Sequence, residues 1–223
     1  YLRDAPAWAV YALCPLAGVA AGMLWGLLPA VCKARWNTNE TLFTLMLNYV
    51  ATQVVSFGIV YWENPKGSNH VGLINSSGRQ GWLPDLAGNG YLLPILIVLT
   101  LTALLYIYMN FTKQGYEIAV VGESENTARY AGMNVGRIIM RTMFLSGAIS
   151  GIVGFIVVSG ANATLYDGVA AGVGFTAITV AWLAQLNPWG ILLVSSLFGI
   201  LEKGSSVVEL SLIHISEPTR LGM

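Results

Sequence analysis

The sequence has very little charge. Only 10% of its 223 residues are Asp, Glu, Lys or Arg and 55% are hydrophobic, whereas a soluble domain carries about 25% charged residues. The charges also cluster, and the five long gaps between them contain 28, 22, 27, 25 and 34 uncharged residues. A helix needs roughly 20 apolar residues to cross a hydrocarbon core of ~30 Å. These gaps predict membrane spans, and because their apolar residues are continuous rather than alternating, the spans are helical.

Residues that carry chemistry are also scarce. The chain has two cysteines and two histidines, and its net charge is zero. Cys14 and Cys32 fall on one predicted helix, about 27 Å apart, too far for a disulfide. No GxxxxGK[ST], HExxH, CxxC or GxSxG motif occurs. The sequence therefore predicts no catalytic residue, no metal site, no cofactor bound by this chain and no nucleic-acid partner.

The apolar gaps divide into about 5–6 membrane segments. Four spans are expected over 8–31, 41–61, 91–111 and 138–158. The gap of 34 residues is too long for one span and too short for two, and glycines and an Asn-Pro pair interrupt it. It predicts a short or re-entrant segment over 174–186 and a span over 189–201. Broken helices are tolerated at membrane depth only inside protein or along a cavity. The expected fold is all-α, a polytopic helical membrane protein and a fragment of a larger bundle.

The basic residues predict the orientation of these spans. The loop after the first span has two basic residues, and the loop after the third span has three. The connection 62–90 has two, balanced by two acidic residues. Cytoplasmic loops carry an excess of Lys and Arg. Both basic loops are therefore expected on the cytoplasmic side, and 62–90 on the other.

Polar residues form a stripe along the second predicted span. Its members, spaced by three or four residues on one helical face, are Thr41, Thr44, Asn48, Thr52 and Ser56. Such a stripe either lines a solute pathway or makes hydrogen bonds between helices. Thr and Ser alone are typical of hydrogen bonds between helices, and the position of Asn48 near mid-span makes the pathway an equal alternative for that residue. We expect Asn48 and Thr52 to line it, with Thr44, Thr176 and Thr179 behind them.

Small residues form two further stripes, which predict close helix packing. The first span carries Gly18, Gly22 and Gly26. The fourth carries Thr142, Ser146, Ser150 and Gly154, beside Gly147 and Gly151.

The stretch GESENTARYAGMNVGR, residues 122–137, holds about a fifth of the formal charge of the chain. Ser124 can cap a short helix over SENTARYA and Gly132 can end it, which leaves Arg129 and Tyr130 exposed. This helix either rests on lipid headgroups or docks a soluble partner. Its acidic and basic residues are balanced, so anionic lipid gains little, and docking is favoured.

Three segments together resemble a known family. They are GMLWGLLPAVCKARWNTNETLFTLMLNYVA (22–51), GYEIAVVGESENTARYAGMNVGR (115–137) and GVGFTAITVAWLAQLNPWGILLVSSLFG (172–199). The sequence resembles the permease subunit of bacterial ABC importers, in the sugar, nucleoside and branched-chain amino-acid group, most closely its nucleoside and simple-sugar branch. The resemblance implies that 122–137 contains the coupling helix that contacts the ATPase. It assigns coupling to Glu123, Asn126, Arg129, Tyr130 and Gly132. The chain departs from the family at Ser124, Glu125 and Asn126, where Asn-Pro is usual.

The same resemblance implies a function and a set of partners. The chain is expected to be a multi-pass subunit of a prokaryotic inner membrane that forms the pathway for a nucleoside or simple sugar. Its implied partners are cytoplasmic P-loop ATPase subunits, which bind ATP and Mg, a second permease subunit, a solute-binding lipoprotein outside the membrane, and lipid. The chain itself is then no enzyme. The solute, and whether the second permease is identical, stay open.

Two other functions stay open. An ion-coupled secondary transporter needs an ionisable residue inside the membrane, whereas Asp167 and Glu202 are predicted at span ends. A non-transporting membrane scaffold would have an inert stripe at Asn48. Separately, LSLIHISEPTR (210–220) resembles the translation of a sequencing adapter. We therefore expect a permease domain over 1–209, incomplete at both ends, and adapter read-through over 210–223.

Overall fold

The computed structural model describes residues 7–63, 65–73, 83–84, 88–170 and 172–216. It divides into two units, Tyr1–Val169 and Ala170–Met223. The elements of the first unit are α1 (Ala7–Trp36), α2 (Glu40–Trp62), β1 (His70–Leu73), α3 (Leu92–Phe111), α4 (Lys113–Glu123), α5 (Glu125–Tyr130), α6 (Val135–Ile156), the π-helix η1 (Val157–Asn162) and β2 (Thr164–Tyr166). Those of the second are α7 (Val173–Leu183) and α8 (Pro188–Ser216).

Within the described residues, five helices are long and apolar enough to cross a membrane. They cover Val10–Trp36, Glu40–Trp62, Leu92–Phe111, Val135–Gly160 and Pro188–Glu209, and α7 is a shorter apolar helix. This confirms the predicted all-α membrane fold and its number of segments, including the short one. The first helix runs further than expected, through Pro29 to Trp36. Helix α8 continues to Ser216, and the adapter origin of 210–223 stays a prediction.

The break between α7 and α8 has a local cause. Gln185 and Leu186 adopt left-handed backbone conformations, with φ of 52° and 58°. The backbone nitrogen of Trp189 then donates to the Asn187 side chain, at 3.1 Å. Proline at the first position of α8 suits a helix start, where its missing N–H is not needed. The Asn-Pro pair therefore separates the two helices, as the sequence predicted.

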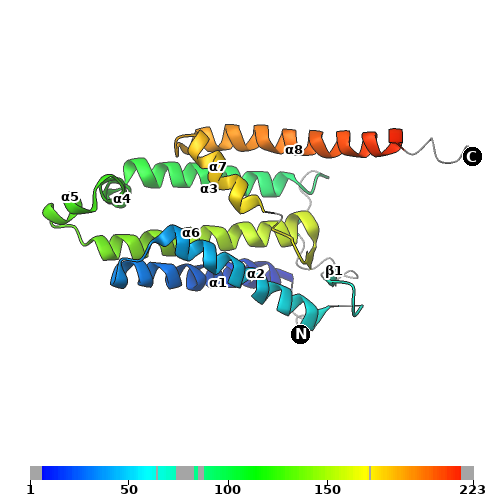
Figure 1. The fold of residues 1–223 in the computed structure, drawn as a ribbon, viewed down its shortest axis with the longest axis horizontal. Helices are drawn as coiled ribbons and strands as arrows, with labels where there is room; N and C mark the ends of the chain where they lie inside the picture. Colours follow the sequence, from blue (N-terminus) through cyan, green and yellow to red (C-terminus); the bar gives the residue numbers. More distant parts are fainter. Residues whose placement is uncertain (1–6, 64, 74–82, 85–87, 171, 217–223) are drawn as a thin grey trace, which may run out of the picture. The chain divides into compact units, whose positions relative to one another are not determined.

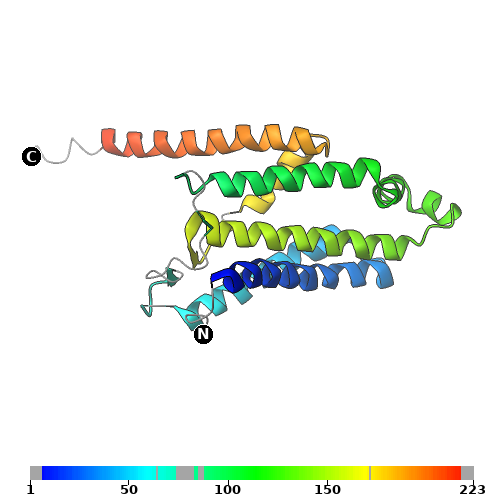
Figure 2. The ribbon, with the colours of Figure 1, turned by 180° about the vertical axis from the view of Figure 1, so that it is seen from behind.

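Helices α1 and α6 lie side by side along most of their length (Figure 1, Figure 2). A Cβ atom added to Gly18 would lie 3.0 Å from the carbonyl oxygen of Gly151. At Gly22 it would overlap the carbonyl oxygen of Gly147, and at Gly26 it would lie 2.9 Å from that of Met143. The two backbones touch, so only glycine fits at these positions. The predicted packing role is confirmed for Gly18, Gly22 and Gly26 on α1 and for Gly147 and Gly151 on α6, whereas a Cβ atom at Gly154 would meet nothing within 4 Å.

Most large side chains on the spans are exposed rather than buried. Leu24, Phe57 and Leu104, for example, lie on the surface of three different spans. The buried apolar residues are few and mostly small, such as Ala30 and Ala148. In water this would be unfavourable, but against lipid tails an apolar side chain gains little by burial. The surface of the spans therefore fits a hydrocarbon solvent.

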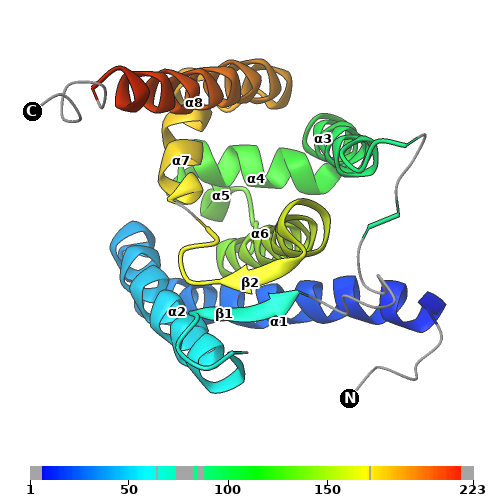
Figure 3. The same ribbon diagram turned by 90° about the vertical axis from the view of Figure 1, so that its right-hand side faces the viewer.

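A small antiparallel sheet, which the sequence did not predict, lies at one end of the first unit. Strand β1 pairs with β2 (Figure 3), and the Thr164 hydroxyl donates to the carbonyl oxygen of Gly72 at 3.0 Å. At the end of α2 that lies near this sheet, the Ser56 hydroxyl donates to the Asp167 carboxylate at 2.8 Å. Residues from the 62–90 connection and from the end of α6 are thereby joined, away from both basic loops.

Candidate functional site

Helix α5 begins and ends where its sequence predicts. The Ser124 side chain accepts a hydrogen bond from the backbone nitrogen of Thr127 at 3.2 Å, and Glu125 occupies the first turn, where the helix dipole favours an acid. Gly132 takes a φ of 76°, which ends the helix at little steric cost. The Asn134 side chain then caps α6 by accepting from the nitrogen of Arg137 at 3.2 Å. These caps hold α5 in a defined place between α4 and α6.

The five predicted coupling residues all lie on the exposed surface around α5: Glu123, Asn126, Arg129, Tyr130 and Gly132. Ala128 is completely buried and fixes the inner face of the helix. Tyr130 is 92% exposed, and the Arg129 side chain is 66% exposed. Tyrosine and arginine are the residue types that most often dominate binding at protein interfaces. The structure thus presents an exposed platform, which we name the α5 surface.

Helix α4 precedes this surface and was expected to be loop. The Thr112 side chain caps it by accepting from the nitrogen of Gly115 at 3.1 Å, and donates to the carbonyl oxygen of Tyr108 at 2.6 Å. Gly115 is buried at the corner, where a Cβ atom would overlap the carbonyl oxygen of Met109. The axis of α4 runs across that of α3, which is seen lengthwise in Figure 1 and end-on in Figure 3. The capping threonine was the signal in the sequence that could have revealed α4.

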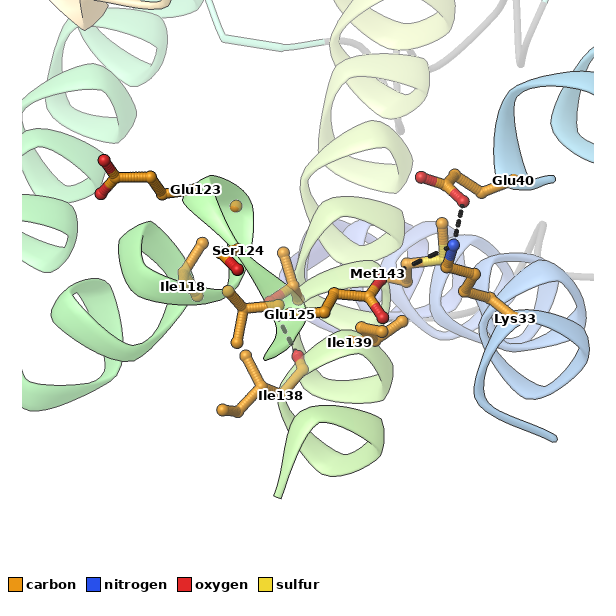
Figure 4. Close-up of a pocket in the computed structure, with 12 residues that line it drawn as sticks. Lys33, Glu40, Ile118, Glu123, Ser124, Glu125, Ile138, Ile139 and Met143 are labelled. Atoms are coloured by element: carbon orange, nitrogen blue, oxygen red, sulfur yellow. Dashed lines mark hydrogen bonds and ion pairs between the residues drawn. The ribbon is translucent and has the colours of Figure 1, made fainter. Parts of the chain in front are cut away.

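The α5 surface is connected to α1 and α2 by ion pairs around Lys33. The ammonium group of Lys33 lies 2.9 Å from the Glu40 carboxylate and 3.7 Å from that of Glu125 (Figure 4). The Lys33 side chain is only 16% exposed, and Glu123 points away from it (Figure 4). Because Lys33 lies in the last turn of α1, Glu40 begins α2 and Glu125 begins α5, three elements meet at one cation.

The turn between α1 and α2 makes this meeting possible. Asn37 takes a left-handed conformation with φ of 48°, which asparagine tolerates better than most residues. The Asn39 side chain caps α2 by accepting from the nitrogens of Thr41 and Leu42, at 3.1 and 3.3 Å. The chain therefore reverses within three residues, and both basic loops lie at one end of the unit, which we name the basic end. The two basic loops were predicted to lie on one side of the membrane, and that this side is cytoplasmic stays a prediction.

Replacement of Lys33 by glutamine is expected to lower the free energy of unfolding by about 1 kcal/mol, because it leaves two nearby carboxylates without their shared cation. The measurement is chemical unfolding in detergent, followed by tryptophan fluorescence. The matched control is Arg35→Gln, which removes an exposed charge from the same helix end and should change stability by less than about 0.5 kcal/mol. Equal effects of the two substitutions would show that the Lys33 pairs contribute nothing.

Asn48 and Thr44 line an open hollow of ≈ 370 Å³ between α1, α2 and α6. Trp25 and Ser146 also face it, beside the glycines of the α1–α6 contact. The Thr44 hydroxyl donates to the carbonyl oxygen of Glu40 at 2.8 Å. No hydrogen bond to the Asn48 side chain is found within the described residues. Its amide is therefore available to a solute, and we name this cavity the Asn48 hollow.

The other predicted pathway residues lie elsewhere. Thr52 does not line the Asn48 hollow, and its hydroxyl donates to the carbonyl oxygen of Asn48 at 3.0 Å. Thr176 and Thr179 belong to the second unit, on α7, where both are exposed. The Thr179 hydroxyl donates to the carbonyl oxygen of Phe175 at 3.5 Å. The structure thus brings Thr44 and Asn48 together, and the pathway roles of all five residues stay predictions.

The described residues contain no group of three or more His, Cys, Asp or Glu side chains that could hold a metal ion. Cys14 and Cys32 are both free.

Residues 5–219 match the family described as the permease component of branched-chain amino-acid transport systems. The match covers nearly all of the chain, including both basic loops and the broken α7–α8 region.

Curated relatives support the same family. The chain is 31% identical to the guanosine ABC transporter permease of Bacillus subtilis over 206 residues, which is 91% of this chain and 59% of that protein. It is 29% identical to the glucose ABC transporter permease of Haloferax volcanii, over 92% of this chain and 57% of that protein. It is 28% identical to a nucleoside ABC transporter permease of Lactococcus lactis, over 91% of this chain and 58% of that protein. The chain therefore spans somewhat over half the length of these relatives. No solved structure matches it significantly.

Proposed function

The chain belongs to the family of ABC transporter permease components and is a multi-pass membrane protein, and on this premise we propose that it forms part of the pathway of an ATP-driven importer for a nucleoside or simple sugar. The observation that carries the proposal is the connection from the exposed α5 surface, through Lys33, to the start of the helix that bears Asn48. The chain performs no covalent chemistry in this role.

The α5 surface supports the part of the proposal that concerns ATP. A permease without a phosphate loop needs a separate ATPase, and that ATPase needs a rigid surface to push on. We propose that Glu123, Asn126, Arg129, Tyr130 and Gly132 form this surface. ATP binding closes a pair of P-loop ATPases, the closure moves α5, and the charge contacts of Lys33 carry the movement to α1 and α2.

The Asn48 hollow supports the part that concerns the solute. An amide offers both a donor and an acceptor, and the ring of Trp25 offers a flat apolar surface next to it. Sugar hydroxyls and nucleobases use both kinds of contact, since small-molecule sites combine mostly apolar walls with a few placed polar groups. The guanosine, glucose and nucleoside relatives agree with this solute class. Thr52, Thr176 and Thr179 are proposed as further pathway residues.

The remaining partners follow from the proposed importer. The spans described here do not make a complete pathway, since the relatives are considerably longer. We propose that the whole subunit pairs with a second permease subunit, either identical or a paralogue. A solute-binding lipoprotein would deliver the solute at the end that bears β1 and β2, opposite the basic end.

Replacement of Asn48 by leucine tests the proposed pathway. In proteoliposomes that contain the full-length permease with its ATPase and binding protein, Asn48→Leu should lower uptake of labelled guanosine or glucose at least tenfold. Leucine branches at the same carbon as asparagine, so the Asn48 hollow keeps roughly its shape but loses its free amide. A substrate that is recognised by hydrogen bonds binds much more weakly when its partner in the site is removed. ATPase activity without solute should stay unchanged, because the α5 surface is untouched.

The matched control is Asn110→Leu on α3. That amide donates to the carbonyl oxygen of Tyr106 on its own helix, at 2.9 Å, and does not line the Asn48 hollow. It should leave uptake within about twofold of wild type. Normal uptake by Asn48→Leu would remove Asn48 from the pathway. If the wild-type assembly hydrolyses ATP but imports neither solute, the proposed solute class is wrong.

A further inference from the structure

Another hollow, of ≈ 440 Å³, lies at the basic end, between the first turns of α4 and α6. Its functionally relevant lining residues are Lys113, Tyr116, Glu117, Gly132, Arg137 and Arg141. Neither the Lys33 contacts nor the Asn48 hollow includes any of the cations among them. We name this cavity the basic hollow.

The basic hollow has an excess of positive charge. Arg141 pairs with the Glu117 carboxylate at 3.1 Å, and among the described residues Glu117 is the only acidic one in the lining. Lys113 and Arg137 form no ion pair with any other described residue. The Nε atom of Arg141 is buried and has no hydrogen-bond partner among the described residues. The Arg141 side chain as a whole is 36% exposed, and an anion in the hollow would offset the excess of positive charge.

The position of the basic hollow identifies the level of the membrane at which such an anion would lie. Lys113 follows the last residue of the span Leu92–Phe111 by two positions, and Arg137 and Arg141 lie in the first two turns of the span that begins at Val135. Helix α4 runs across these spans (Figure 3), as does a helix that lies in the plane of an interface. Tyr116 is 64% exposed beside the hollow, and exposed tyrosines are typical of the membrane–water boundary.

We propose that the basic hollow binds the phosphate of an anionic glycerophospholipid from the cytoplasmic leaflet. A guanidinium group matches a phosphate in shape and charge, and basic pockets between helices on the cytoplasmic side bind acidic headgroups. A lipid fits better than a soluble partner because Arg141 belongs to a membrane span. A headgroup lies at that level with its acyl chains along the helices, whereas a soluble protein would have to enter the bilayer. The bound phosphate would fix α4 against α6.

The proposal differs from the interpretation of α5 as a lipid-binding helix. Around α5 the acids Glu123 and Glu125 offset the basic residues, so lipid gains little there. In the basic hollow three cations face one carboxylate. Gly132 borders both surfaces, but the cations proposed to hold the phosphate are not among the proposed coupling residues. Substitution of these cations therefore tests lipid binding separately from ATPase docking.

The experiment compares lipid association of the full-length protein and of the Lys113→Gln/Arg137→Gln variant, with no ATPase or ATP present. Each protein is placed in phosphatidylcholine vesicles that contain either spin-labelled phosphatidylglycerol or spin-labelled phosphatidylcholine. The fraction of each labelled lipid whose motion the protein restricts is measured, and the ratio of the two fractions gives the preference for the anionic lipid. A cation near the surface contributes about fivefold to such a preference. Loss of both should therefore lower the preference by at least fivefold. Arg141 is left intact because its pair with Glu117 joins α6 to α4.

Lys66→Gln/Lys203→Gln is the matched control, because it removes the same number of lysine or arginine charges outside the basic hollow. It should keep the wild-type preference. A Lys113→Arg/Arg137→Lys variant keeps both charges and should also keep it, which separates charge from misfolding. Wild-type lipid preference in the Gln variant overturns the proposal, and if that variant also loses ATPase association, the basic hollow is a protein-docking surface. A further test adds inorganic phosphate at roughly 10 mM to the wild-type protein. If the phosphate lowers the lipid preference as much as the substitutions do, the ligand is a soluble phosphate and the proposal is overturned.

Discussion

The Arg129→Glu variant is expected to bind the ATPase with an affinity about a hundredfold or more below that of the wild type, and to lose transport as a result. Arg129 projects from the α5 surface, and its pair with Glu125 is exposed and long, at 3.9 Å. Exposed pairs of this kind contribute little to folding, so the variant should fold normally. Placing like charges against each other across an interface costs several kcal/mol, and about 2.7 kcal/mol corresponds to a hundredfold in affinity.

The measurement is co-purification of the ATPase with the permease in detergent, together with uptake in proteoliposomes. Arg129→Gln, which removes the charge without reversing it, should show a smaller loss. Lys66→Glu reverses an exposed charge that belongs to the 62–90 connection, and should associate normally. If Arg129→Glu retains the ATPase with wild-type affinity, α5 is not the docking element and the assignment of the coupling residues is wrong.

Substitution of Gly22 by alanine is the second change with a large expected effect. The added methyl group would overlap the carbonyl oxygen of Gly147, which belongs to the backbone of α6 and cannot rotate away. The helices must separate, and the remaining close contacts along both glycine stripes are lost with them. Overpacking costs typically 1–3 kcal/mol where side chains can adjust, and we expect about 3 kcal/mol or more here. The Gly147→Ala variant should behave in the same way.

Gly154→Ala is the matched control for this prediction. Gly154 lies on α6, the helix that bears Gly147, but a Cβ atom there would meet nothing within 4 Å. Alanine should be neutral or stabilise the helix by about 0.5–1 kcal/mol, because glycine loses more backbone entropy on folding. Thermal unfolding in detergent, monitored by loss of the monodisperse gel-filtration peak, compares the three variants. Equal midpoints for Gly22→Ala and Gly154→Ala would contradict the backbone contact between α1 and α6.

The spans and the close packing of α1 with α6 follow from local features of the sequence. An uncharged segment that is long enough to cross a bilayer can be recognised without reference to any other segment. A repeat of small residues every four positions likewise marks one face of a single helix. The caps of α5 are equally local, since Ser124, Glu125 and Gly132 act on their own turns. For this reason the sequence alone predicted the elements that bear the candidate site.

The features that were missed depend on partners far away in the chain. Lys33 was counted only as a charge that sets orientation, and its contact with Glu125 appears only when α5 folds back against α1. The β1–β2 pairing joins residues that are separated in the chain by α3, α4, α5, α6 and η1. Helix α4 was missed for a different reason: it lies across the spans and carries both charged and apolar residues, so neither the hydropathy nor the charge distribution distinguishes it from a loop.

The glycine contact between α1 and α6 also sets an order of events during synthesis. About 100 residues separate the end of α1 from the start of α6. At a translation rate of about 5–20 residues per second, α1 waits roughly 5–20 s before its partner exists. During this interval the glycine face of α1 is in contact with lipid, and its backbone atoms are exposed there because glycine has no side chain to cover them. The nascent chain must therefore hold α1 in the bilayer without this contact, which forms only after α6 has left the ribosome.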